Sequence, residues 1–134
     1  HQVFDVGEAQ QTYQSVGEFA RHRLPERSVV FTMLHSGSIR YYAGHLTMRW
    51  MFVGETRFDG LVDEFRRRGM HPYLLLTSIE VDDFKKRFGT HSRLAALDWP
   101  PMARREGVLP VEIFDLGEAF DGRGREATFT ERIE

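Results

Sequence analysis

Residues 28–44, SVVFTMLHSGSIRYYAG, contain the pattern from which the fold is predicted. Ser28–Leu34 is β-branched and apolar without alternation, which is typical of a strand covered on both faces in a parallel sheet. His35–Ser38 then break this pattern, and Ile39–Ala43 has the composition of a short helix that ends at Gly44, a residue suited to a left-handed C-cap. The stretch therefore predicts a central strand, a glycine-serine loop and a helix.

Similar patterns continue on both sides of this stretch. Apolar residues at three- and four-residue steps predict an amphipathic helix over 6–22, which Pro25 stops. Leu46–Trp50 alternates apolar and polar residues, as an outer strand does. The other expected elements are helices over 59–68 and 79–88 (the latter capped by Ser78), a helical turn over 94–97, a second central strand Pro72–Thr77, a strand Val111–Phe114 and an antiparallel C-terminal strand over 127–133.

The order of these elements predicts an α/β protein. Strands that alternate with helices indicate parallel pairing with right-handed crossovers, and hence a three-layer α/β/α sandwich around a mainly parallel, Rossmann-like sheet. Two strands are fully apolar and one alternates, which favours the strand order 2-1-3-4 over 3-2-1-4. We expect residues 1–134 to form one α/β domain cut from a longer protein, with 117–134 either less ordered or an edge hairpin that turns at Asp121–Gly124.

Composition excludes several classes of function. The 134 residues, 41% of them hydrophobic, suffice for one domain with a modest core. A net charge of -2 gives no strong positive field, so we expect no nucleic-acid partner. The absence of Cys removes disulfides, thiolate metal sites and thiol nucleophiles. The longest apolar run, Tyr73–Leu76 extended by Thr77, is far shorter than the ~20 residues of a membrane-spanning helix, so we expect the chain itself to be soluble.

The loop after Leu34 is the candidate site. It lies at the carboxyl end of a predicted central strand, where open α/β sheets bind ligands. The amides of Gly37, Ser38 and Ile39 would begin a helix there and attract an anion, and Glu80 follows the second central strand at the same edge. A sugar or a phosphate is the expected ligand, and the candidate ligand-binding residues are His35, Ser36, Gly37, Ser38, Arg40 and Glu80.

A plainer interpretation of these residues needs no ligand. Ser36 would cap the helix, Gly37 would permit a tight turn, and Tyr41 and Tyr42 would pack on the sheet. Glu80 would only compensate a helix dipole. The plainer interpretation is favoured, because the loop has neither G-x-G-x-x-G nor the lysine of a P-loop.

Other constellations predict no catalysis and no bound metal or cofactor. His35 and Ser36 are adjacent but lack the G-x-S-x-G elbow of a serine hydrolase, and the six histidines are scattered without H-E-x-x-H. Asp82–Asp83 belongs to a helix start, which favours acids, and Arg66–Arg68 and Lys85–Arg87 belong to helix ends, which favour bases. We therefore name no catalytic residue and no metal ligand.

The run from Pro25 to Trp50, followed by RRRGMHPYLLLTSIEVDDFKKRF (66–88) and LDWPP (97–101), resembles a known family. It is similar to the soluble carboxyl-terminal region of bacterial membrane glycosyltransferases related to the dolichyl-phosphate-mannose-protein mannosyltransferase class. The resemblance spans roughly Pro25–Phe114. It implies that sugar transfer is performed by acidic residues in loops near membrane-spanning helices, none of which belongs to this chain.

The resemblance thus implies a non-catalytic accessory domain whose parent protein is a glycosyltransferase. The domain would lie on the extracytoplasmic, periplasmic side of a bacterial inner membrane, with the membrane-spanning part of the same polypeptide as its partner, and would aid acceptor or sugar recognition. Two alternatives stay open. One is a small cytoplasmic enzyme or sensor that binds a sugar phosphate or nucleotide at Ser36–Ser38, and the other is a protein-interaction module that uses the exposed face of the first helix.

Overall fold

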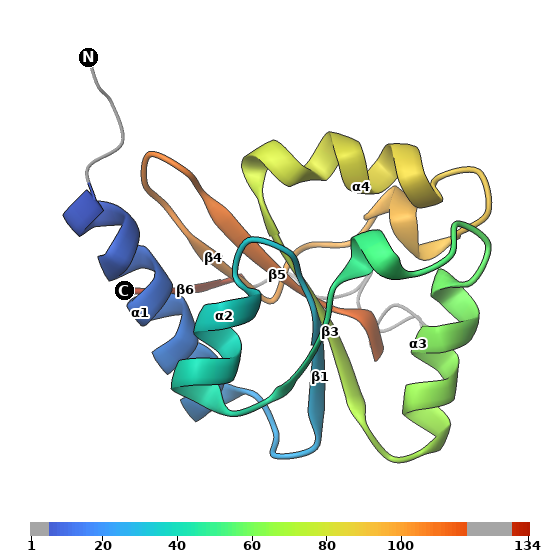
Figure 1. Ribbon diagram of the computed structural model, residues 1–134, viewed down its shortest axis with the longest axis horizontal. Coiled ribbons are helices and arrows are strands. Elements are labelled where there is room, and N and C mark those ends of the chain that lie inside the picture. The colour runs from blue at the N-terminus through green and yellow to red at the C-terminus, as the bar shows by residue number, and fades with distance from the viewer. Residues whose placement is uncertain (1–5, 118–129) are drawn as a thin grey trace.

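The computed structural model describes residues 6–117 and 130–134, which form one six-stranded sheet with helices on both faces (Figure 1). The helices are α1 (Val6–Arg23), α2 (Ser36–Ser38), α3 (Phe58–Arg67) and α4 (Val81–Phe88). A π-helical turn covers Ile39–Ala43, and 3₁₀ turns cover Trp50–Phe52, Ser78–Glu80 and Leu94–Ala96. The strands are β1 (Ser28–Phe31), β2 (Leu46–Met48), β3 (His71–Thr77), β4 (Ala103–Arg105), β5 (Val111–Asp115) and β6 (Glu131–Arg132).

The sheet is mixed, with strand order β2-β1-β3-β5-β4-β6. β1 pairs in parallel with β2 on one side and with β3 on the other, as expected. The complete order differs from the expected 2-1-3-4, and β5 runs antiparallel to both β3 and β4. The antiparallel β4–β5 pair follows from its connection, because residues 106–110 are enough for a hairpin but too few for the crossover of a parallel pair.

The C-terminal strand is shorter than expected and pairs differently. β6 is parallel to β4, with Ala103 opposite Glu131, so the expectation of an antiparallel C-terminal pairing is wrong. Both edges of β5 are already bonded to β3 and β4, and β6 pairs with the remaining edge of β4. The expected turn at Asp121–Gly124 lies outside the described residues.

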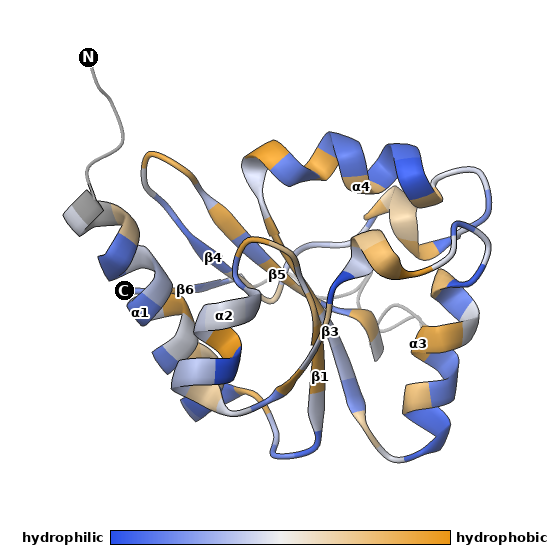
Figure 2. Cartoon of the chain, viewed as in Figure 1, coloured by the Kyte–Doolittle hydropathy of each residue, from blue (hydrophilic) through white to orange (hydrophobic). Residues whose placement is uncertain are grey.

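Helices cover both faces of the sheet, which confirms the α/β class. On one face α1 and the turn Ile39–Ala43 pack over Val30 and Leu75, while on the other α3 and α4 pack over Phe31 and Leu74. Figure 2 shows apolar and polar positions alternating along α3 and α4, as expected of amphipathic helices. All four residues of β1 are buried, as the continuous apolar run predicts.

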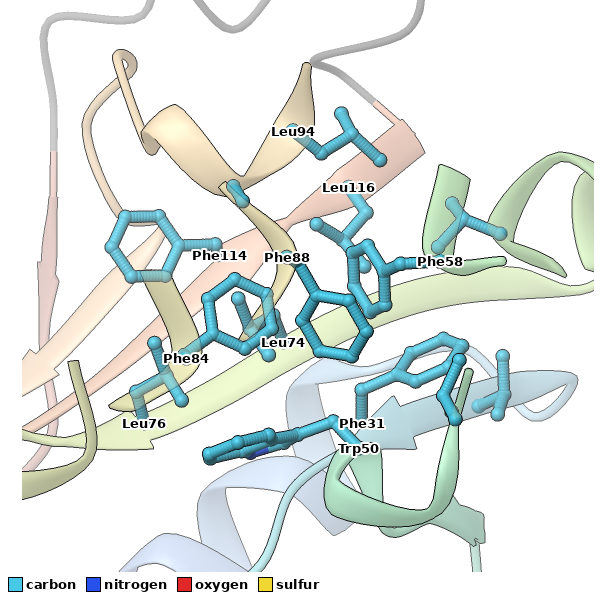
Figure 3. Packing of buried hydrophobic residues seen from close by; sticks show 14 of the residues in the cluster. Phe31, Trp50, Phe58, Leu74, Leu76, Phe84, Phe88, Leu94, Phe114 and Leu116 are labelled. Carbon is cyan, nitrogen blue, oxygen red and sulfur yellow. The ribbon is translucent and has the colours of Figure 1, made fainter. Parts of the chain in front are cut away.

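Aromatic rings fill the layer between the sheet and the helices α3 and α4 (Figure 3). Phe58 lies with its ring centroid 5.1 Å from that of Phe31 on β1 and 5.3 Å from that of Phe84 on α4, both in edge-to-face geometry. Trp50 meets Phe84 at 5.4 Å and a perpendicular angle. Edge-to-face pairs add favourable quadrupole contacts to the burial of apolar area. Because Phe58 contacts both Phe84 of α4 and Phe31 of β1, the rings connect the helix layer to the sheet.

Phe84→Ala is expected to lower the free energy of unfolding by about 3–5 kcal/mol, because it removes a fully buried ring and leaves a cavity. Phe52→Ala is the matched control, since Phe52 is 78% exposed and its loss should change stability by less than about 0.5 kcal/mol. Urea denaturation followed by circular dichroism measures both values. Equal stability losses in the two variants would show that the ring cluster is not the core.

Candidate functional site

β1 leaves the sheet earlier than the expected end at Leu34. The N–H of Thr32 donates to the carbonyl of Met48 at 2.9 Å, and the chain then turns, with the N–H of Ser36 donating to the carbonyl of Met33 at 3.2 Å. α2 begins at Ser36 rather than Ile39, and the helical segment ends at Gly44 with φ 72°. The predicted sequence of strand, loop and short helix is thus confirmed with shifted boundaries, at the carboxyl end of β1.

The candidate residues of this loop divide into a buried and an accessible set. His35 and Ser36 are buried, whereas Gly37 and Arg40 are exposed and Ser38 is half-buried. The N–H of Ile39, expected to face an anion, instead donates to the carbonyl of His35 at 3.0 Å. Since α2 is a single short turn and this amide is already bonded, the loop offers little of the partial positive charge that a phosphate needs.

Glu80 is buried and bonds within the protein. Its Oε1 accepts the backbone N–H and the hydroxyl of Thr77, each at 2.9 Å, and its Oε2 accepts the N–H of Leu34 at 3.4 Å. Thr77 in turn accepts from the backbone of Glu80, so the pair forms a capping box, and the helix cap is Thr77 rather than the expected Ser78. Glu80 thus joins the ends of β1 and β3.

His35 lies under α1. Its side chain is 1% exposed, and its ring meets that of Tyr13 edge to face with centroids 4.8 Å apart. Nδ1 of His35 has no hydrogen-bond partner within residues 6–117 and 130–134. Burial lowers the pKa of His35 from 6.5 to about 4, because the charged ring would lose its hydration. His35 is therefore neutral near pH 7 and supports the position of Tyr13 rather than reaching solvent.

A surface groove of 340 Å³ lies beside this loop and was not predicted from the sequence. Its walls are α1 and the segment from Leu34 to Tyr42, and Tyr41 is 82% exposed on its rim. A Cβ atom on Gly37 would meet no heavy atom within 4 Å, so this part of the groove is open. The lining residues are Gln10, Tyr13, Leu34, Gly37, Ser38, Tyr41 and Tyr42.

Gly17 sets the spacing of the two walls. A Cβ atom on Gly17 of α1 would lie 2.5 Å from Cβ of Tyr42, a distance that packed atoms do not adopt. Any side chain there would push the turn Ile39–Ala43 away from α1. A glycine inside a helical pattern is the one sequence signal that indicates such a close approach.

The described residues hold no group of three or more His, Cys, Asp or Glu side chains placed to bind a metal ion. Nor is any helix within 6–117 and 130–134 long and apolar enough to span a bilayer. The groove presents tyrosine rings, hydroxyl groups and an amide to a ligand.

The pH dependence of stability tests the burial of His35. Because its folded pKa is depressed, only the unfolded chain binds this proton as pH falls from 6.5 to about 4, so stability decreases over that interval. Between neutral pH and pH 4, the free energy of unfolding of His35→Phe should fall by about 3 kcal/mol less than that of the unchanged chain. His91→Gln, at an exposed histidine, should leave the loss unchanged. Urea titrations across this pH range measure the difference, and parallel curves for all three proteins would contradict the burial.

Substitution of Gly17 tests the close approach. Gly17→Ala should destabilise the protein by about 1–3 kcal/mol, because its methyl group overlaps Tyr42. Gly60→Ala, on α3 with open space around its Cβ position, should be neutral or stabilising by up to about 1 kcal/mol. Thermal denaturation gives the sign of each change. Stabilisation by both alanines would mean that α1 and the turn Ile39–Ala43 are further apart.

The structure thus brings together a buried set (His35, Ser36, Glu80) that holds the strand ends in place and an accessible set (Gly37, Ser38) that lines the groove with Tyr13, Tyr41 and Tyr42. Arg40 is exposed but does not line the groove. Comparisons with protein-family models, with curated proteins and with solved structures found no match.

Proposed function

We propose that this chain is a non-catalytic accessory domain of a membrane-bound glycosyltransferase-like protein. It would lie on the extracytoplasmic side of a bacterial inner membrane and pack against the membrane-spanning part of the same polypeptide, where it would aid acceptor or sugar recognition. The resemblance over residues 25–114 motivates this proposal, and the distribution of exposed apolar side chains carries it.

Large exposed apolar side chains gather at one edge of the sheet. Among the described residues, five of the seven large exposed apolar side chains follow the ends of β1, β2, β3 and β4, and we call these five the apolar edge: Leu34, Met51, Phe52, Ile79 and Val108. β1, β2 and β3 are parallel, and β4 runs in the same direction because it is antiparallel to β5, which is antiparallel to β3. The loops that follow these four strands therefore meet at the same edge.

Hydrogen bonds hold three of these loops side by side. The N–H of Leu34 donates to Glu80 at 3.4 Å, which joins the loop after β1 to the turn after β3. The N–H of Ser78 donates to the carbonyl of Pro110 at 2.9 Å, which joins that turn to the hairpin between β4 and β5. The loops that carry Leu34, Ile79 and Val108 are thus adjacent at the edge where Met51 and Phe52 also follow β2. An exposed apolar patch at such an edge can serve as a contact with a protein or a membrane.

A covalently attached partner fits this surface best. A surface with only a few apolar side chains binds a separate molecule weakly. A partner on the same polypeptide has a high effective concentration, so it needs little additional affinity. We do not propose the alternative of a sugar-phosphate or nucleotide-binding enzyme or sensor. The Ile39 amide is bonded internally, and Arg40 does not line the groove.

Association with the remainder of the reading frame tests the proposal. The 134-residue chain and the rest of its frame, expressed separately, should associate in detergent, and the chain alone should transfer no sugar from a lipid-linked donor. Phe52→Ser combined with Ile79→Ser should weaken the association about tenfold or more, since it removes two apolar contacts. Leu46→Ser is the matched control, because Leu46 is exposed at the opposite end of β2.

Pull-down and a transfer assay measure these outcomes. A frame without membrane-spanning segments would overturn the proposal, as would sugar transfer by the chain alone. Equal binding of the double variant and the unchanged chain would show that the apolar edge is not the docking surface.

A further inference from the structure

We infer that the groove between α1 and the segment Leu34–Tyr42 binds a neutral glycosyl group. The inference rests on the proposed function in one respect, because it names the ligand class for the recognition role of the same domain. The groove itself supplies the reasons. They are the absence of charge among the lining residues that the structure describes, the kinds of polar group that the lining presents, its exposed aromatic rim and the rigidity of its walls.

Among the described residues, those that line the groove include none with a charged side chain. Its polar groups are the amide of Gln10 and the hydroxyls of Tyr13, Ser38, Tyr41 and Tyr42. These groups both donate and accept hydrogen bonds, so they match the hydroxyl groups of a sugar. A phosphate or carboxylate would lose hydration in this groove without gaining a cation, which disfavours sugar phosphates and nucleotides.

Tyr41 provides an aromatic surface for the ligand. Its ring is 82% exposed and stands edge to face on Tyr42, with centroids 4.8 Å apart. A pyranose ring has one face of C–H groups, whose partial positive charge suits the negative face of an aromatic ring. The hydroxyl of Ser38 donates to the carbonyl of His35 at 3.1 Å, so its oxygen stays available as an acceptor. One side of a sugar can thus pack on the rim while its hydroxyls bond to the lining.

The walls of the groove are held in place before a ligand arrives. Tyr13 rests on the buried ring of His35, and Gly17 allows Tyr42 to pack directly on α1. Preformed walls reduce the entropy lost on binding. The volume of 340 Å³ is at the lower end of the range for small-molecule sites, which suits a glycosyl group.

Saturation-transfer NMR on the 134-residue chain tests the inference. The probes are methyl α-mannopyranoside and methyl β-glucopyranoside, with mannose 1-phosphate and AMP as the anionic comparison. At least one glycoside should bind with millimolar affinity, and the anionic probes should bind about fivefold more weakly or not at all. Tyr41→Ala should weaken glycoside binding about fivefold or more.

Two matched controls separate this result from a change in folding. Phe52→Ala removes an equally exposed aromatic ring outside the groove and should leave glycoside binding unchanged. Gly37→Leu fills the open part of the groove and should abolish binding, whereas Gly60→Leu, at an equally open and exposed helical position on α3, should not. Circular dichroism of each variant confirms that it is folded.

Three outcomes would overturn the inference. They are binding of neither glycoside, tighter binding of the anionic probes, and glycoside binding that survives both Tyr41→Ala and Gly37→Leu. None of these affects association through the apolar edge, which Phe52→Ser with Ile79→Ser tests separately. If the unchanged chain does not associate with the rest of its frame but still binds a glycoside at the groove, the proposed function fails while this inference stands.

Discussion

The parallel pairing of β1 with β2 and β3 is the constraint on which the other features depend. Ser28–Phe31 is buried on both faces, so these four residues can only occupy the interior of the sheet. Parallel neighbours bring their carboxyl ends to one edge, and the loops after them must therefore meet there. The capping box of Thr77 and Glu80 and the apolar edge follow from that meeting of loops, and the loop after β1 supplies one wall of the groove, whose other wall is α1.

Local pattern was sufficient to predict the strands that are buried on both faces and the helices that bury one face. β1 and β3 carry continuous apolar runs, and α1, α3 and α4 carry apolar stripes with marked ends. β4 was missed because Ala103–Arg105 has two charged residues and no apolar run. The directions of β5 and β6 were predicted wrongly because pairing direction depends on connection lengths and on which strand edges remain free, and neither is a local property.

In the candidate site too, features that depend on local pattern were predictable, and those that depend on contacts distant in sequence were not. The loop at the end of β1 was predicted from the change in composition at His35, and its position at the carboxyl edge is confirmed. The role of Glu80 was recoverable, because a threonine three residues before a glutamate is a capping-box pattern, but the cap was assigned to Ser78. The groove was not recoverable, since it requires α1 to approach Tyr42 at Gly17 across a large separation in sequence.

Backbone amide NMR of the ¹⁵N-labelled chain during titration with methyl α-mannopyranoside and methyl β-glucopyranoside is the most direct measurement. If the meeting of strand ends has built a neutral sugar site, at least one titration should shift the resonances of Gln10, Gly37, Ser38 and Tyr41 together, with a single dissociation constant and no change at α3. With both glycosides, shifts confined to other elements, or none at concentrations of tens of millimolar, would contradict this interpretation of the carboxyl edge.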